Sequence, residues 1–124
     1  MKFAKRVFLV AGVYGVIVIV PMYFAEGRIG RDHPPAITHP EFYYGFLGVA
    51  LAWQVVFLVL AQDPSRYRPM VIPSVLEKVS YGIAPAVLLL EHRIPLVVFG
   101  LDSVDWIFAV LFVAAYLATP AGAA

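Results

Sequence analysis

The stretch LVVFGLDSVDWIFAVLFVAAYL, residues 96–117, decides how this chain folds. It is long enough to cross a bilayer as one helix, yet it carries two carboxylates, Asp102 and Asp105. Its Leu, Ile, Val and Phe residues together favour insertion by about 6 kcal/mol, and two aspartates at depth nearly cancel that gain. We therefore expect both aspartates to face protein, water or a cation rather than lipid.

The spacing of the two aspartates places them on one face of a helix. That face continues at heptad-like spacing and comprises Val98, Asp102, Asp105, Ala109, Phe112 and Tyr116. We predict that this face points inward, but two starting points leave its depth open. A helix that begins at Pro95 carries Asp105 about 15 Å into the bilayer. A helix that begins at Ser103, with Asp102 and Ser103 as its cap, leaves both acids at the interface.

The composition indicates a membrane protein. The 124 residues are 62% hydrophobic and 14% charged, with a mean hydropathy of +0.86, which is too apolar for an ordinary soluble domain. Four apolar segments predict an all-α integral membrane four-helix bundle, a single domain over residues 1–124. The predicted spans lie at about residues 7–24, 42–61, 74–90 and 95–118. The first span is longer than the core of a signal peptide, so we expect it to be retained.

The charges predict an orientation and give no sign of nucleic-acid binding. The net charge is +1, and no basic run with interleaved aromatic residues is present in the sequence. With the amino terminus inside, the cytoplasmic side carries Lys2, Lys5, Arg6, Arg66, Arg68 and Lys78. The outer side carries Arg28, Arg31 and Arg93. Because cytoplasmic loops carry the excess of Lys and Arg, both termini are predicted to lie in the cytoplasm.

Small residues and a capping pattern predict how the spans pack and begin. The first span has a patch of small residues, Ala11, Gly12 and Gly15, and the second has a stripe, Gly45, Gly48 and Ala52. Small residues let neighbouring helices approach closely in a membrane, so we expect both sets to lie at helix contacts. In the third span, Ser74 followed by Glu77 has the pattern of a capping box, which predicts that the helix begins at Ser74.

Polar side chains at membrane depth form the candidate site. At 1.5 Å per residue, Lys78 lies about 7 Å from the cytoplasmic face, and Asp105 and Gln54 lie about 15 and 18 Å from the outer face. The candidate ligand- or proton-binding residues are Gln54, Glu77, Lys78, Asp102, Asp105 and Trp106, with Tyr14 and Tyr81 as further hydrogen-bond partners. Ionisable groups inside a membrane are commonly functional, which favours a proton relay, cation site or polar ligand pocket. The alternative is a structural salt bridge that locks the helices together.

Other chemistry lacks a signature in this sequence. There is no cysteine, which excludes thiolate catalysis and cysteine-ligated metal sites. His39 and Glu41 have atoms that suit a divalent metal, but they lie in a loop with no recognised ligand spacing. No histidine falls inside a predicted span, and no serine has a Gly-x-Ser-x-Gly context. We therefore predict no catalytic residue, no metal site and no cofactor.

Three segments carry a resemblance to known proteins: HPEFYYGFLGVALAWQ (residues 39–54), DPSRYRPMVIPSVLEKVSYG (63–82) and GLDSVDWIFAVLFVAAY (100–116). They resemble a group of bacterial four-span inner-membrane proteins whose activity is uncharacterised. In size and hydropathy the chain is also similar to the DoxX-like small membrane proteins, in architecture only. The resemblance implies a four-helix bundle in a bacterial inner membrane and transfers no catalytic residue.

These observations favour a non-enzymatic small inner-membrane protein, an accessory or small-ligand-binding subunit with the polar cluster at its core. Its expected partners are the lipid bilayer and either another membrane protein or further copies of itself. Two alternatives stay open. One is an oligomeric proton-coupled transporter in which Asp102 or Asp105 exchanges a proton for substrate. The other is a membrane enzyme acting on a lipid or quinone, with the two aspartates as an acid/base pair.

Overall fold

A computed structural model of the chain describes residues 2–121 and shows helices joined by short connections. Residue 1 and residues 122–124 of the predicted domain lie outside the described residues. The elements in chain order are α1 (Lys2–Met22), α2 (Glu26–Asp32), α3 (Pro40–Gln62), the 3₁₀ turn η1 (Arg68–Met70), α4 (Val71–Leu90), α5 (Leu96–Asp102) and α6 (Val104–Ala118). Over residues 2–121 there is no strand, so the predicted all-α class is confirmed.

Four helical segments are long and apolar enough to cross a membrane: Lys2–Met22, Pro40–Gln62, Arg68–Leu90 and Leu96–Ala118. Each has 21 or 23 residues, and at 1.5 Å per residue such lengths cover the roughly 30 Å hydrocarbon core of a bilayer. Many of their large apolar side chains point outward, among them Ile17, Val49, Leu76 and Val110, each more than 60% exposed. Length and composition therefore support a membrane protein.

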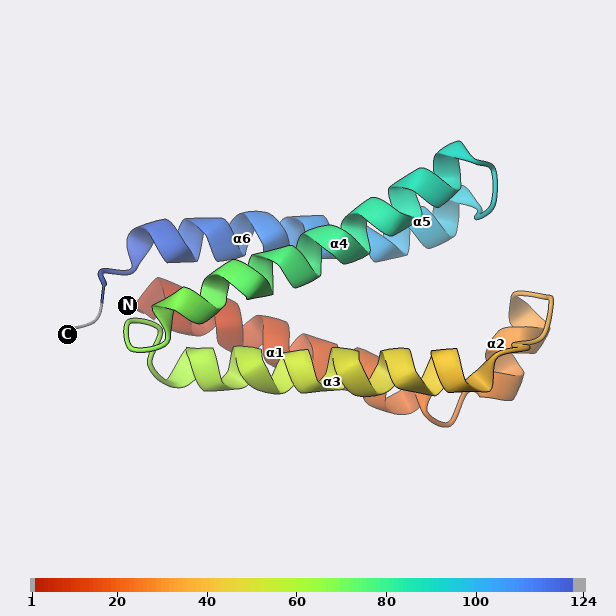
Figure 1. Cartoon of the computed structure of the whole chain (residues 1–124), viewed down its shortest axis with the longest axis horizontal. Coiled ribbons are helices and arrows are strands. Elements are labelled where there is room, and N and C mark those ends of the chain that lie inside the picture. The colour runs from red at the N-terminus through yellow and green to blue at the C-terminus, as the bar shows by residue number, and fades with distance from the viewer. Residues whose placement is uncertain (1, 122–124) are drawn as a thin grey trace.

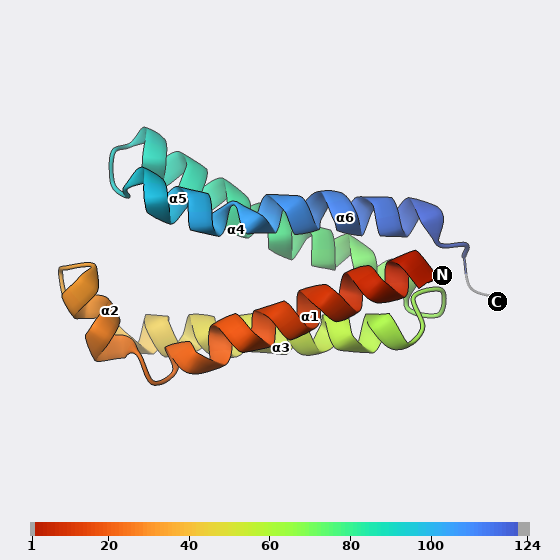
Figure 2. The same ribbon diagram turned by 180° about the vertical axis from the view of Figure 1, so that it is seen from behind.

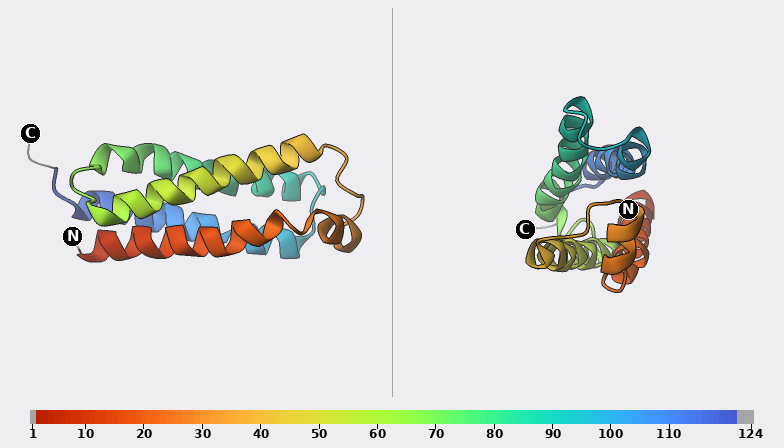
Figure 3. Two further views of the ribbon diagram at one scale, coloured as in Figure 1. Left: turned by 90° about the horizontal axis from the view of Figure 1, so that it is seen from below. Right: turned by 90° about the vertical axis from the view of Figure 1, so that its right-hand side faces the viewer.

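The long helices form two antiparallel pairs (Figures 1 and 2). Helix α1 packs along α3, α4 packs along α5 and α6, and contacts between α1 and α6 join the pairs. The end-on view in Figure 3 shows one pair above the other. The start of α1 and the end of α6 lie at the same end of the bundle, where the pairs converge, and the pairs diverge toward α2 (Figure 1).

The convergent end is held by aromatic side chains from three helices. Phe8 of α1, Phe57 of α3 and Phe112 of α6 are all completely buried. The ring centroids of Phe8 and Phe112 are 4.8 Å apart, and those of Phe57 and Phe112 are 5.0 Å apart. Aromatic pairs of this kind contribute about 0.5–1.5 kcal/mol each beyond their burial. This cluster therefore fixes how the two pairs meet.

The predicted inward face of the last span is confirmed. Its six residues, Val98, Asp102, Asp105, Ala109, Phe112 and Tyr116, are all buried or partly buried. The two starting points considered for this span each describe part of it. The helix begins at Leu96, and it is interrupted only at Ser103, with α5 and α6 running end to end (Figure 1). The predicted cap is wrong, because the Ser103 hydroxyl donates a hydrogen bond backward to the Phe99 carbonyl oxygen at 2.7 Å.

The predicted capping box at Ser74 is also wrong. Helix α4 begins at Val71, directly after η1, so Ser74 lies inside the first turn rather than before it. Its hydroxyl donates to the Met70 carbonyl oxygen at 2.7 Å, which is the bond that a buried serine makes within a helix. Glu77 is thereby free of any capping role and faces the space between the helix pairs.

The packing prediction for small residues is confirmed in the first span and wrong in the second. Ala11, Gly12 and Gly15 are buried, which confirms that this patch lies at a helix contact. A Cβ on Gly12 would lie 2.7 Å from the Leu58 side chain, and one on Gly15 would overlap the side-chain amide of Gln54. The stripe Gly45, Gly48 and Ala52 is exposed, so its predicted packing role within this chain is wrong. Helix α3 instead buries the face formed by Leu47, Ala50, Gln54 and Phe57.

The surroundings of Gly15 and Gly45 predict that the same substitution, glycine to alanine, affects stability differently at the two positions. Gly15→Ala is expected to destabilise the fold by about 1–3 kcal/mol, because the new methyl group displaces the buried Gln54 amide. Gly45→Ala makes the same change in a helix but has nothing within 4 Å of its Cβ, so we expect no loss of stability. Thermal unfolding of both variants in detergent measures the difference. Equal stability of the two proteins would contradict the packing of α1 on α3.

Candidate functional site

A buried lysine lies at the centre of the space between the helix pairs. Lys78 projects from α4 with only 5% of its side chain exposed. Its Nζ atom is 3.3 Å from Asp105 Oδ1 and 3.7 Å from Glu77 Oε2. The ammonium also lies 5.0 Å from the ring centroid of Phe57 and 5.4 Å from that of Phe108. A buried charge is tolerated only when it is paired, and here two carboxylates and two aromatic faces surround it.

Asp105 reaches this lysine because the α5–α6 segment runs beside α4. It is the tenth residue counted from Leu96, which places it about 15 Å along the span. Because Ser103 interrupts the helix, Asp105 also lies in the first turn of α6. A carboxylate in a first turn is favoured by the positive end of the helix dipole. Asp105 is therefore stabilised by both Lys78 and its own helix.

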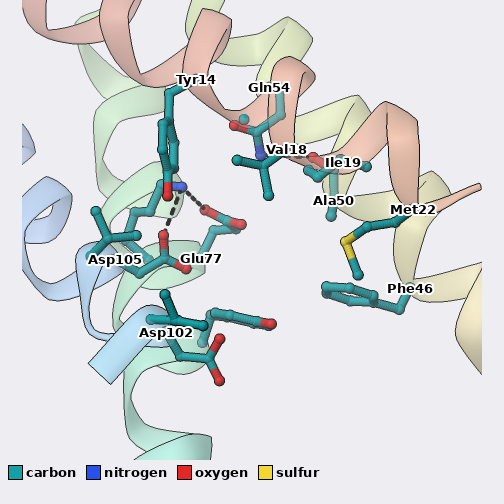
Figure 4. Close-up of a pocket in the computed structure, with 15 residues that line it drawn as sticks. Tyr14, Val18, Ile19, Met22, Phe46, Ala50, Gln54, Glu77, Asp102 and Asp105 are labelled. Atoms are coloured by element: carbon teal, nitrogen blue, oxygen red, sulfur yellow. Dashed lines mark hydrogen bonds and ion pairs between the residues drawn. The ribbon is translucent and has the colours of Figure 1, made fainter. Parts of the chain in front are cut away.

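Asp102 lies one turn before Asp105 and is the carboxylate without a protein partner. It is partly buried at the end of α5. It makes no side-chain hydrogen bond or ion pair with residues 2–121, since Lys78 is directed at Asp105 and Glu77. Its side chain nevertheless lines the same space (Figure 4). Asp102 can therefore accept hydrogen bonds from a molecule that is not part of the described chain.

Gln54 places an amide on the opposite wall, where α3 packs against α1. The residue is only 2% exposed, and its Nε2 atom donates to the Ala50 carbonyl oxygen at 2.8 Å. Its Oε1 atom is buried without a hydrogen-bond partner, and the same is true of Glu77 Oε2. Buried polar atoms without partners are rare in folded proteins, and each one needs an explanation. Here both atoms are acceptors.

These side chains line a cavity of about 110 Å³ between the two helix pairs (Figure 4). The polar wall consists of Tyr14, Gln54, Glu77, Lys78, Tyr81, Asp102 and Asp105. The apolar wall includes Val18, Ile19, Met22, Phe46 and Ala50. Three carboxylates face one ammonium group, so the described lining has a formal charge of −2 if every group is ionised. The cavity therefore favours a positively charged occupant.

The structure brings together five of the six residues predicted for the site. Gln54, Glu77, Lys78, Asp102 and Asp105 all line the cavity, but Trp106 does not. The indole of Trp106 instead packs against Gly82 of α4, where a Cβ would lie 2.6 Å from its Nε1 atom. Trp106 therefore holds α6 against α4 rather than facing the cavity.

Sequence reasoning missed Phe46, which forms part of the cavity wall. The signal that could have found it is spacing, because Phe46, Ala50 and Gln54 follow one another at four-residue intervals on one face of α3. Among residues 2–121, no three His, Asp or Glu side chains lie close enough together to hold a metal ion. His39 instead forms a local contact with Glu41, at 3.2 Å from Nδ1 to Oε1, on the exposed surface.

Comparison with known proteins identifies no relative of this chain. No protein-family model, no curated protein and no solved structure matches the chain. The resemblance to bacterial four-span proteins stays a prediction from the sequence.

The buried ion pair generates a prediction about energetic coupling. Lys78→Met is expected to destabilise the protein by about 3–5 kcal/mol, because it leaves Glu77 and Asp105 without their cation. Asp105→Asn should cost less, since Glu77 still faces the lysine. The double variant should cost clearly less than the sum of the two single changes. Equilibrium unfolding of the four proteins in detergent measures this coupling.

An exposed ion pair supplies the control for this cycle. Arg93 and Glu91 lie 3.6 Å apart with 68% and 52% of their side chains exposed. Their coupling is expected to be at most about 1 kcal/mol, because solvent screens exposed charges. If Lys78 and Asp105 couple no more strongly than this pair, the buried salt bridge does not form.

Proposed function

We propose that this chain is a non-enzymatic integral protein of a bacterial inner membrane, with four spans and both termini in the cytoplasm. Four long apolar helices with outward apolar side chains support the membrane location. Five Lys and Arg residues lie near one end of the spans and three near the other, and this bias supports the orientation: Lys2, Lys5, Arg6, Arg66 and Arg68 against Arg28, Arg31 and Arg93. The resemblance to bacterial four-span proteins supports the bacterial inner membrane.

Within this framework, we propose that the protein binds a small organic cation in the cavity. The observation that carries the proposal is the character of the polar groups that lack partners there. Gln54 Oε1 and Glu77 Oε2 are buried acceptors without a hydrogen bond, although Glu77 Oε2 faces the Lys78 ammonium at 3.7 Å. The Asp102 carboxylate lines the cavity and makes no hydrogen bond or ion pair with residues 2–121. A ligand that satisfies them must donate hydrogen bonds, and the three carboxylates against one lysine in the lining favour a positive charge on it.

A primary ammonium group meets both requirements. It carries three N–H donors and no acceptor, which matches the two buried atoms without a hydrogen bond, Gln54 Oε1 and Glu77 Oε2, since both are acceptors. A quaternary ammonium group has the same charge but no donor, so it would leave these oxygens unsatisfied. Tyr14 and Tyr81 add two aromatic rings to the cavity wall, and aromatic rings attract cations. The proposal therefore distinguishes ammonium groups by their hydrogens and not by charge alone.

Ethylammonium is a probe small enough for the cavity, and it tests the proposal in the purified protein. A ligand present at 100 times its Kd stabilises the folded state by about 2.7 kcal/mol, so the unfolding temperature should rise with ethylammonium concentration. At equal ionic strength, tetramethylammonium, ethanol and ethanesulfonate should have little effect. The absence of any ethylammonium-specific stabilisation would overturn the proposal.

Asp102→Asn provides the matched variant for this measurement. It removes the carboxylate that has no protein partner, so we expect the fold to persist while the stabilisation by ethylammonium falls by about 1.5–3 kcal/mol, the range for a charged hydrogen bond. Asp32→Asn makes the same change on α2, where the carboxylate is exposed and pairs with Arg28. The Asp32 variant should respond to ethylammonium as the unmodified protein does.

A further inference from the structure

A second hollow lies beside the cavity, on the outer surface between α3 and α4. These helices follow one another in the sequence but touch much less than α1 and α3 do. The groove between them has a volume of about 740 Å³, and its walls include Gly45, Val49 and Trp53 of α3 and Leu76 of α4. In a membrane this surface faces the lipid, so the groove is open to molecules that move within the bilayer.

The groove and the cavity share a boundary. Phe46, Ala50, Glu77 and Tyr81 line both spaces. The rings of Phe46 and Tyr81 stack across the gap between α3 and α4, with centroids 5.6 Å apart and an interplanar angle of 10°. Two side chains thus stand between a lipid-facing groove and an acidic interior. Glu77 lies at this boundary as well.

The cavity and the groove differ in size, so they suit different parts of a ligand. At about 110 Å³ the cavity is smaller than the roughly 300–1,000 Å³ of typical small-molecule sites. It has room for an ammonium group and few carbon atoms. The adjoining groove is several times larger and mostly apolar, so it suits an alkyl chain.

Building on the proposed cation site, we propose that the ligand is a single-chain primary amine that arrives from the bilayer. Its ammonium group lies in the cavity between Gln54, Glu77 and Asp102, and its alkyl chain lies in the groove between α3 and α4. Charge complementarity selects the headgroup, because three carboxylates and one lysine line the cavity. The unpartnered Gln54 oxygen, inside a residue that is 2% exposed, is an independent sign of a missing donor.

The groove supplies access and shape rather than a hydrophobic driving force. An alkyl chain is already in apolar surroundings in the bilayer, so it gains little by moving against protein side chains. The headgroup therefore supplies most of the affinity. A phospholipid with an amine headgroup fits less well, because its phosphate would lie among carboxylates and the single cavity lysine is already paired with Asp105.

Trp53 offers a direct optical reporter of an occupied groove. The chain has two tryptophans, and Trp53 lines the groove while Trp106 packs on α4. In a Trp106→Phe background, reconstituted in phosphatidylcholine nanodiscs, dodecylammonium brominated along its chain should quench Trp53 fluorescence saturably. Dodecanol brominated at the same carbon reports the quenching due to simple partition into the lipid. Quenching by the amine that merely equals that of the alcohol would overturn the proposal.

A pair of glycine substitutions tests whether the chain lies in the groove. Gly45 lines the groove with nothing within 4 Å of its Cβ, so Gly45→Phe fills the groove without a clash inside the protein. We expect Gly45→Phe to lower the apparent affinity measured by saturable quenching about tenfold or more, because the phenylalanine side chain and the alkyl chain would occupy the same space. Gly100→Phe is the matched control, because Gly100 is equally unobstructed but lines neither space. It should leave the quenching unchanged.

The two proposals fail in distinguishable ways. Suppose that ethylammonium stabilises the protein but the brominated amine quenches Trp53 equally in the Gly45→Phe and Gly100→Phe variants. The cation site then stands, and the groove proposal is overturned. If neither amine has an effect that depends on Asp102, both are overturned. Quenching that phosphatidylethanolamine in the nanodisc competes away would overturn the assignment to a single-chain amine in favour of a phospholipid.

Discussion

The ammonium of Lys78 lies inside an apolar bundle, where an unpaired charge is strongly unfavourable. Asp105 and Glu77 compensate it from two helices, so α4 and α6 must keep one register. The rings of Phe57 and Phe108 lie 5.0 and 5.4 Å from the ammonium and add a favourable cation–π contact to this pairing. The need to neutralise Lys78 also explains why the last span can carry two aspartates, since one of them pairs with the lysine.

The lysine lies between two differently packed halves of the bundle. Where the helix pairs converge, the completely buried side chains of Phe8, Phe57 and Phe112 pack between them. Toward α2 the pairs diverge, and the polar cavity and the lateral groove occupy the space that results (Figures 1 and 4). A firmly packed end thus holds an open end in place. Such an arrangement keeps acceptor groups in fixed positions without filling the volume that they surround, which is what preorganised binding requires.

Much of this site could be predicted from residue types alone. Asp102 and Asp105 are too costly in lipid to face it, so their inward direction follows from spacing and free energy of transfer. The same reasoning brought Lys78 and Asp105 to similar depths. It failed for the stripe that includes Gly45, because small residues permit close packing but do not require it, and for the Ser74 cap, because η1 starts the helix earlier.

The sequence by itself determined the helical class, the four apolar spans and the inward face of the last one, because these depend on hydropathy and periodicity along a single chain. Only the tertiary structure decided which acid pairs with the lysine and which remains free. It also decided that Trp106 faces Gly82 and that α3 and α4 part to leave a groove. These features depend on how helices rotate and diverge relative to one another, and that is set by packing among all four spans.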